Sequence, residues 1–167
     1  MHSLADPANG AAPMYDMIEL FYFAYRDFVG DADRLLETFG FGRAHHRVLH
    51  FVARHPGLTI AELLDILAIT KQSLNRVLKE LVAQDFVKAR AGAADRRQRR
   101  LHVTAKGDDL ALKLARAQTR RFAAAMRALG PDAKSEAAAF LLEMIDRDAR
   151  ARVLALIGAA SEPAEAR

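Results

Sequence analysis

The chain of 167 residues contains no cysteine. This absence excludes thiol catalysis, sensing by thiol oxidation and zinc sites built on cysteine ligands. It is also consistent with a cytoplasmic location, where structural disulfides are rare. Proline is scarce as well, with 5 residues, while hydrophobic residues make up 51% of the sequence. We therefore expect a chain that can bury a core without covalent cross-links.

Long uncharged apolar runs are also missing. A helix that crosses a bilayer needs about 18 or more consecutive apolar residues. The most hydrophobic segment, residues 14–29, is interrupted at four charged positions: Asp16, Glu19, Arg26 and Asp27. The first thirteen residues lack the basic region and apolar core of a secretory signal. These features predict a soluble protein that stays in the cytoplasm and does not contact a membrane.

Motifs of enzymatic chemistry are absent. The sequence has no glycine-rich phosphate loop and no nucleophile elbow. Its acidic residues are scattered in positions typical of helix caps and ion-pair partners. We expect a protein that is not an enzyme, with no catalytic residue and no cofactor.

Positive charge is concentrated in one window of the sequence. Residues 70–107 hold ten lysines and arginines against three acids, a charge of +7, whereas the rest of the chain sums to −3. A solvated surface can carry such a run. This window also contains the second helix of a helix-turn-helix pattern, however, and basic surfaces beside a groove-reading helix are typical of nucleic-acid binding. The coincidence predicts that the chain binds DNA.

The first predicted helix spans residues 14–29 and ends at Gly30. It is apolar on nearly every face, whereas a helix on the surface of a monomer keeps a polar half. We expect a second copy of the chain to cover it. A short helix over residues 31–39 is predicted to follow.

Two helix starts in close succession mark the centre of the chain. A helix over residues 43–55 precedes them. Thr59 then heads a capping box with Glu62 at the third helical position. A few residues later, Thr70 is placed to cap the next helix, expected over about residues 70–84. Two helices separated by so tight a turn form a helix-turn-helix.

The second helix of this pair has two distinct faces. Its apolar residues recur at the spacing of one buried stripe: Leu74, Val77, Leu78 and Leu81. The opposite face carries side chains that can bind DNA: Lys71, Gln72, Ser73, Asn75, Arg76 and Lys79. Gln72, Asn75 and Arg76 are assigned to base edges, because amides pair with adenine and guanidinium with guanine. The side chains assigned to phosphates are Thr70, Lys71 and Lys79, and Ser73 is a permissive neighbour.

A basic hairpin follows. Residues 86–91 and 101–104 read as two short strands joined by a polar loop over residues 92–100. Arginines crowd the loop: Arg96, Arg97, Arg99 and Arg100. We predict that this hairpin is a wing and that Arg97 enters the minor groove. Asp95 is available to orient the Arg97 guanidinium, or alternatively serves only as a turn-former.

Two long helices complete the predicted chain. Thr104 caps a helix that extends to about residue 128, where Gly130 and Pro131 break it. A final helix over residues 132–157 carries apolar residues at helical spacing. The apolar surface of these helices exceeds what a small winged-helix core can cover, which again favours an intertwined homodimer.

The hairpin and the helix before it resemble the MarR family of bacterial transcription regulators, over roughly residues 14–157. The wing motif Asp-x-Arg followed by Leu-x-Val-Thr-x-x-Gly is present: Asp95, Arg97, Leu101, Val103, Thr104 and Gly107. Residues 69–81 match the family's recognition helix. The arginine density exceeds the pattern's requirement at Arg96, Arg99 and Arg100, so which arginine enters the minor groove stays open.

The resemblance implies a mainly α fold with a small β-hairpin wing: a winged helix-turn-helix with N- and C-terminal dimerisation helices. The chain would divide into a flexible tail (1–13), N-terminal dimerisation helices (14–42), a DNA-binding lobe (43–107, recognition helix about 70–84, wing about 86–104), a long helix with a C-terminal dimerisation helix (105–158) and a second tail (159–167). It further implies a homodimer that binds a pseudo-palindromic operator in double-stranded DNA and that a small-molecule effector can release from this operator.

Three alternatives remain open at this point. His46 and His50 lie four apart on one helix face, a spacing that can hold zinc, and some members of the family sense zinc. No third ligand is evident, so we expect solvent-facing or partly packed imidazoles and no metal site. The resemblance suggests an effector pocket near Phe21, Tyr22 and Tyr25, although these aromatics can equally be dimer core. Lastly, the chain can be a winged-helix module that has lost DNA binding and uses its basic wing to bind an acidic protein. Such a module would not need the outward amides and arginine of the recognition helix.

Overall fold

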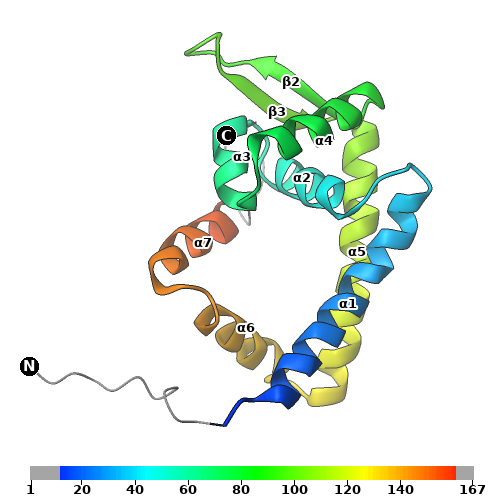
Figure 1. Ribbon diagram of the computed structural model, residues 1–167, viewed down its shortest axis with the longest axis vertical. Coiled ribbons are helices and arrows are strands. Elements are labelled where there is room, and N and C mark those ends of the chain that lie inside the picture. The colour runs from blue at the N-terminus through cyan, green and yellow to red at the C-terminus, as the bar shows by residue number, and fades with distance from the viewer. Residues whose placement is uncertain (1–11, 161–167) are drawn as a thin grey trace, which may run out of the picture.

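The computed structural model describes residues 12–160, and the tails predicted over residues 1–13 and 159–167 lie almost entirely outside this range. The described residues form seven helices and one three-stranded antiparallel sheet, which confirms the mainly α class. Figure 1 shows the helix-turn-helix and the wing at one end of the molecule, with long helices extending away from them. Within residues 12–160, no helix is both long and apolar enough to cross a membrane.

Helix α1 (Tyr15–Glu37) is continuous. The prediction that it ends at Gly30, with a separate helix over residues 31–39, was wrong. The helix continues because its C-terminal part has a buried stripe of its own: Val29, Ala32 and Leu36. A glycine inside a helix costs only about 1 kcal/mol relative to alanine, which this packing outweighs. The chain turns instead at Gly40, whose φ of +70° favours glycine.

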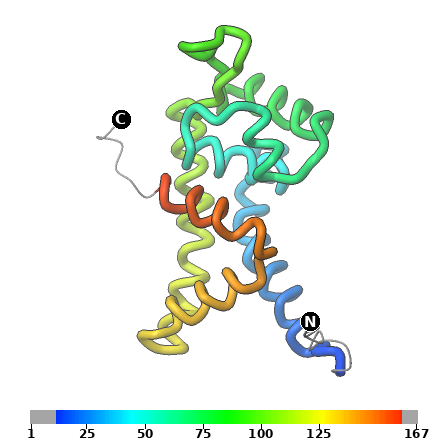
Figure 2. The backbone as a smooth tube through the Cα atoms, turned by 90° about the vertical axis from the view of Figure 1, so that its left-hand side faces the viewer, coloured from blue at the N-terminus to red at the C-terminus, as the bar shows by residue number. Residues whose placement is uncertain are grey.

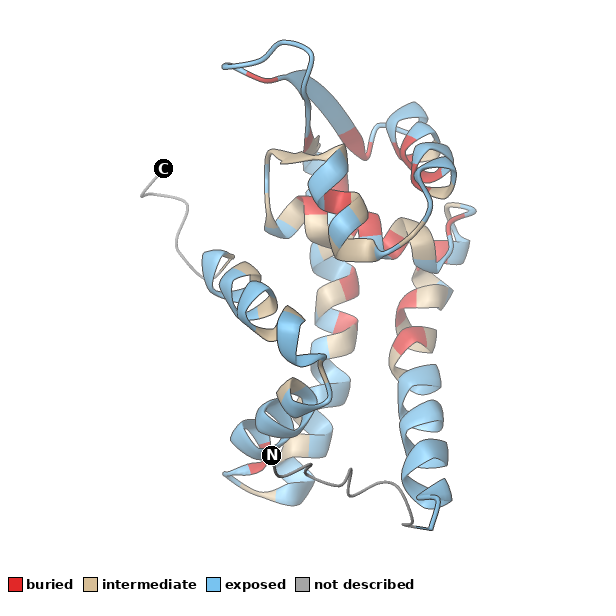
Figure 3. Cartoon of the chain, turned by 60° about the vertical axis from the view of Figure 1, so that its left-hand side comes forward, coloured by how far each residue is buried: buried red, intermediate tan, exposed pale blue. Residues whose placement is uncertain are grey.

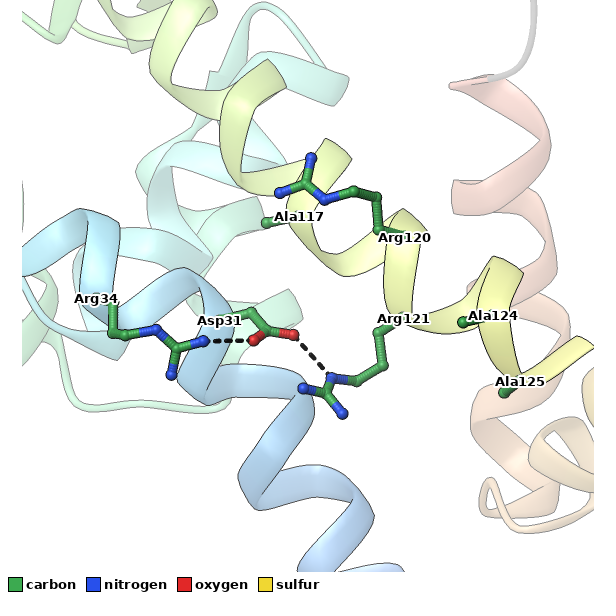
Figure 4. Close-up of a pocket in the computed structure, with 7 residues that line it drawn as sticks. All are labelled: Asp31, Arg34, Ala117, Arg120, Arg121, Ala124 and Ala125. Atoms are coloured by element: carbon green, nitrogen blue, oxygen red, sulfur yellow. Dashed lines mark hydrogen bonds and ion pairs between the residues drawn. The ribbon is translucent and has the colours of Figure 1, made fainter.

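Helix α5 (Ala105–Leu129) packs against α1. The Asp31 carboxylate accepts hydrogen bonds from Arg34 at 2.6 Å and from Arg121 of α5 at 2.8 Å. Figure 4 shows the two guanidinium groups approaching this carboxylate from either side. The bond from Arg121, helped by Arg34, holds the pKa of Asp31 below its usual value. This clamp joins the C-terminal half of α1 to α5, whereas the N-terminal half diverges from α5 (Figure 2).

The lobe between these helices contains six elements: α2 (Arg43–Arg54), β1 (Leu58–Thr59), α3 (Ile60–Leu67), α4 (Lys71–Ala83), β2 (Val87–Ala91) and β3 (Arg99–Val103). The strands lie in the order β1-β3-β2. Strand β1 was not predicted, because two residues are too few to show an alternation. It pairs with the base of the wing, with Leu58 opposite Leu101 and Thr59 opposite Arg100.

The two helix caps predicted for the helix-turn-helix are confirmed. Thr59 Oγ1 accepts from the Glu62 backbone N–H at 3.2 Å, and the Glu62 carboxylate accepts from the Thr59 N–H at 2.7 Å. The bond from the Thr59 backbone N–H, together with one from the Thr59 hydroxyl at 2.9 Å, lowers the pKa of Glu62. Thr70 Oγ1 accepts from the Ser73 N–H at 3.1 Å and so begins α4. Between the two helices Ala68 adopts a left-handed φ of 50°, which turns the chain within three residues.

The predicted apolar stripe of α4 is buried at all four positions, so the recognition helix presents the face that its sequence pattern indicates. It packs with the rest of the lobe's core, including Leu49 and Leu63, neither of which is exposed to solvent. The wing is fixed to α5 by a close approach of backbones. A Cβ added to Gly107, in the first turn of α5, would overlap the carbonyl oxygen of Phe86. The family motif therefore needs glycine there for a steric reason.

The C-terminal part of the chain differs from its prediction. One helix was expected over residues 132–157, but the structure has two, α6 (Ala133–Glu143) and α7 (Arg147–Ala159). The break between them contains neither proline nor glycine. Arg150 replaces the lost helical hydrogen bonds, since its guanidinium donates to the backbone carbonyls of Glu143 at 2.7 Å and Ile145 at 2.9 Å. A side chain beyond the break thus stabilises it.

Candidate DNA-binding surface

Helix α4 exposes the polar face that the sequence predicted. Five of the side chains assigned to DNA are exposed: Lys71, Gln72, Asn75, Arg76 and Lys79. The wing rises beside α4 at the same end of the molecule (Figure 1). The structure therefore brings together the two elements that carry most of the predicted site.

Two residues assigned to the site are already used by the fold. The Thr70 hydroxyl accepts from the Ser73 backbone and donates to Ser73 Oγ at 3.0 Å. Ser73 is also half-buried. Their first role is to begin α4, which aims the free N-terminal amides and the side chains of the first turn outward.

The tip of the wing is a tight turn stabilised by Asp95. Its carboxylate accepts a hydrogen bond from the backbone N–H of Arg97 at 2.9 Å. This is the contact expected of a turn-former, and among the described residues Asp95 forms no ion pair with the Arg97 guanidinium. Gly92 closes the loop, because a Cβ there would lie 2.8 Å from the Asp95 carbonyl oxygen. The sharp turn leaves the neighbouring side chains pointing outward.

The arginines of the wing fall into two groups. Arg100 braces the wing against the lobe, since its guanidinium donates to the Gly57 carbonyl at 3.1 Å and to Gln98 Oε1 at 3.4 Å. Arg96, Arg97 and Arg99 are exposed and join none of the ion pairs found within residues 12–160. These three remain the candidates for the minor groove.

Residues outside the predicted site hold α4 in place. His45, in the first turn of α2, lies with its Nε2 atom 2.6 Å from the Glu80 carboxylate of α4. Lys106 of α5 donates to the Gln84 carbonyl at the end of α4 at 2.9 Å, and its ammonium group lies over the Phe86 ring. These contacts join segments 22 and 35 residues apart. No local sequence pattern could have indicated them.

A cavity of about 280 Å³ lies between α1, α2 and α5. Its walls are mostly apolar and include Tyr25, Phe28 and Phe51, together with His46 and His50. Of the three aromatics suggested for an effector pocket, the structure brings only Tyr25 to this cavity. Phe21 lines a separate hollow of about 570 Å³ between α1 and the end of α6. Tyr22 is exposed.

The surroundings of the two histidines in this cavity disfavour their charged form. Burial lowers the pKa of His46, and repulsion between His46 and His50 lowers it further. Burial likewise lowers the pKa of His50. Within the described part of the chain, no group of three or more His, Asp or Glu residues has a metal-binding arrangement. The zinc alternative therefore gains no support from the geometry.

Comparisons with known proteins agree with this architecture. A model described as the MarR family matches residues 39–98. PetP, an HTH-type transcriptional regulator of Rhodobacter capsulatus, is 48% identical over 129 residues, which cover 77% of this chain and 78% of PetP. Similar folds include a MarR transcriptional regulator from Methanosarcina mazei (TM-score 0.66, 20% identity, 82% of this chain and 92% of that one) and S. aureus MepR in a DNA-binding conformation (TM-score 0.66, 20% identity, 77% and 95%). The chain belongs to the MarR family of DNA-binding transcription regulators.

Proposed function

We propose that this regulator binds a pseudo-palindromic operator as a homodimer, with one α4 helix of each protomer in successive major grooves and the wings beside them. The observation that carries the proposal is the pairing of an exposed, groove-reading face on α4 with a wing that exposes Arg96, Arg97 and Arg99, none of which joins an ion pair within residues 12–160. Arg76 offers a guanidinium to a guanine edge, and Gln72 and Asn75 offer amides to adenine. Lys71 and Lys79 are suited to phosphates, which set the register on the duplex.

The homodimer is supported by apolar surface that a single chain leaves uncovered. The large apolar side chains of α1 from Tyr15 to Tyr25 are exposed, and Figure 3 shows this N-terminal half of the helix as exposed. Phe21, for example, is 52% exposed, and the hollow beside it is lined by Met17, Phe140 and Met144. A continuous apolar surface made of N- and C-terminal helices is what a self-complementary interface requires.

The cavity between α1, α2 and α5 is suited to a small, largely apolar effector. Its aromatic and aliphatic walls would bury such a ligand, and Gln118 and Arg47 offer polar groups at its boundary. Because α2 also carries His45, which contacts α4, occupancy of this cavity can act on the DNA-binding surface. Tyr25 is the member of the predicted aromatic set that fits this role.

Footprinting and binding titrations on genomic fragments test the proposal. We expect protection of half-sites whose centres lie about 10 base pairs apart. With roughly 8 phosphates contacted per dimer, affinity should fall by about 10³ to 10⁵ between 50 and 200 mM salt. Arg76→Ala should cost roughly 1–3 kcal/mol per base contact and relax preference at one position of each half-site. Lys71→Ala is the matched control, because it should weaken all sequences alike and flatten the salt slope.

The wing has its own test. Arg97→Ala should reduce affinity most where the flanking DNA is an A-tract, since a narrow minor groove attracts arginine most strongly. If the wild-type protein prefers no genomic fragment over random DNA, and the α4 and wing variants bind as it does, the proposed mode of operator recognition is wrong. Protein interaction through the basic surface would then become the leading explanation for this lobe.

A further inference from the structure

We infer that His45 is a positioning residue for DNA recognition: it holds the Glu80 carboxylate and so keeps Arg76 free to read a base. This inference rests on the base-reading role proposed for Arg76. It concerns a contact between α2 and α4 that lies outside the surface expected to touch DNA.

The hydrogen bonds of His45 define its role. The backbone N–H of Gly42 donates to Nδ1 at 3.1 Å, so this nitrogen carries no proton. Nε2 therefore carries the proton and donates it to the Glu80 carboxylate at 2.6 Å. One imidazole thus caps the start of α2 and binds the recognition helix.

The imidazole has little freedom to move. Its side chain is 12% exposed, and its ring stacks on the Phe41 ring, with centroids 4.7 Å apart and planes inclined by 13°. Phe41 is itself buried against the ring of Phe86. The donor to Glu80 is therefore held by the core of the lobe.

The position of Glu80 makes this contact important for the DNA-binding face. Glu80 lies four residues after Arg76 in the same helix, the separation at which opposite charges pair on a helix surface. Glu80 instead contacts His45, and Arg76 joins none of the ion pairs of residues 12–160. A carboxylate released from His45 would compete with DNA for the Arg76 guanidinium. It would also place a negative charge nearer to the phosphates.

Two substitutions separate the functions of the two ring nitrogens. Asparagine carries an amide oxygen near the position of Nδ1, so His45→Asn can keep the Gly42 cap while losing the donor to Glu80. Glutamine carries an amide nitrogen near the position of Nε2, so His45→Gln can keep the donor while losing the cap. A purely structural role would make the two variants similar in DNA binding.

The experiment compares operator and random DNA binding by His45→Asn, Glu80→Gln and the double variant, with thermal unfolding of each. An ion pair at this spacing shifts an equilibrium about two-fold, and a dimer contains two recognition helices. We therefore expect His45→Asn to lower the preference for operator about four-fold. Glu80→Gln should keep that preference, because a neutral amide does not compete for Arg76. The double variant should regain the preference of Glu80→Gln, whereas His45→Gln should lose little.

The outcomes are decisive in both directions. Rescue of His45→Asn by Glu80→Gln, without recovery of thermal stability, supports the inference. A double variant that prefers operator no more than His45→Asn, or a His45→Asn protein with unchanged preference, overturns it. Arg76→Ala, measured in the same experiment, distinguishes failure of the base-reading role of Arg76 from failure of the positioning role of His45. If Arg76→Ala binds operator normally, the base-reading assignment itself fails; if it loses preference while His45→Asn does not, only the role of His45 fails.

Discussion

The DNA-binding lobe and the helices that extend from it differ in how they cover their apolar surface. In the lobe, the apolar faces of α2, α3 and α4 meet one another and the sheet, so that residues such as Leu63 and Leu74 are fully buried within one chain. In the extending helices, the N-terminal half of α1 and much of α6 and α7 leave large apolar side chains exposed. One region completes its core alone, whereas the other presents a surface that needs a partner.

Helix α1 has one part of each kind. Its C-terminal part buries Val29, Ala32 and Leu36 against the lobe and α5, while its N-terminal half has no such stripe. The hydrophobicity of a sequence window therefore does not show whether its apolar residues are buried by the same chain or by a second one. The change from exposed to buried occurs between Tyr25 and Val29, just before the clamp between Asp31 and Arg121.

The largest effect is expected at the uncovered surface. Phe21→Glu places a charge where a second copy should pack, and an unpaired buried charge costs on the order of 3–5 kcal/mol. Sedimentation equilibrium should show a much weaker dimer. The lobe should stay folded, with slow amide exchange in α4. Val82→Glu, at an exposed apolar position of α4, is the control and should leave association unchanged. Equal dissociation constants for both variants would contradict the assigned interface.

The second prediction concerns a core residue of the lobe, whose truncation should affect folding and not association. Leu63→Ala removes a fully buried side chain of α3, and such truncations cost roughly 2–5 kcal/mol of unfolding free energy. Urea denaturation should show this loss. Dimer dissociation, measured under conditions where the variant is folded, should be unaffected. A large change in association would show that the two regions are not separate in the way proposed.

A smaller effect is expected at the junction between the wing and α5. Gly107→Ala would force the start of α5 away from the Phe86 carbonyl, and overpacking of this kind costs about 1–3 kcal/mol. Gly30→Ala is the matched control within α1. Its Cβ would meet only Arg34 Nη1 at 4.0 Å, so it should stabilise the helix by up to about 1 kcal/mol. Destabilisation by Gly30→Ala would argue against a continuous α1.

The smallest effect is a pH dependence at the cavity between the two regions. Burial lowers the pKa values of His46 and His50 in the folded protein below the ordinary value of 6.5. The unfolded chain then binds more protons, so stability is constant at high pH and is lost as the pH falls below about 6.5. Urea midpoints between pH 7.5 and 5 should show this loss, and His46→Gln should reduce it. The same slope in both proteins would disprove the contribution of His46.

Much of the lobe could be predicted because its signals are local. Thr59 and Thr70 begin helices through bonds to residues three positions later, and the stripe of α4 repeats within two turns. The wing motif is likewise short. These patterns predicted which face of α4 is exposed, and with it the residues proposed to bind DNA.

The errors occur where distant contacts outweigh local signals. Gly30 suggests a helix end, but the packing of the residues after it continues α1. The break between α6 and α7 has no proline or glycine, and Arg150 stabilises it from beyond. The short motif around Asp95 did not show which group its carboxylate contacts, and the structure places that carboxylate on the Arg97 backbone N–H.

The sequence by itself therefore determined the caps, the buried face of α4, the basic wing and the family, because each depends on residues close together along the chain. Only the tertiary structure decided that Arg100 braces the wing and that His45 meets Glu80. These contacts join residues more than 30 positions apart. Their geometry is set by the packed core between them, so no pattern within either segment contains it.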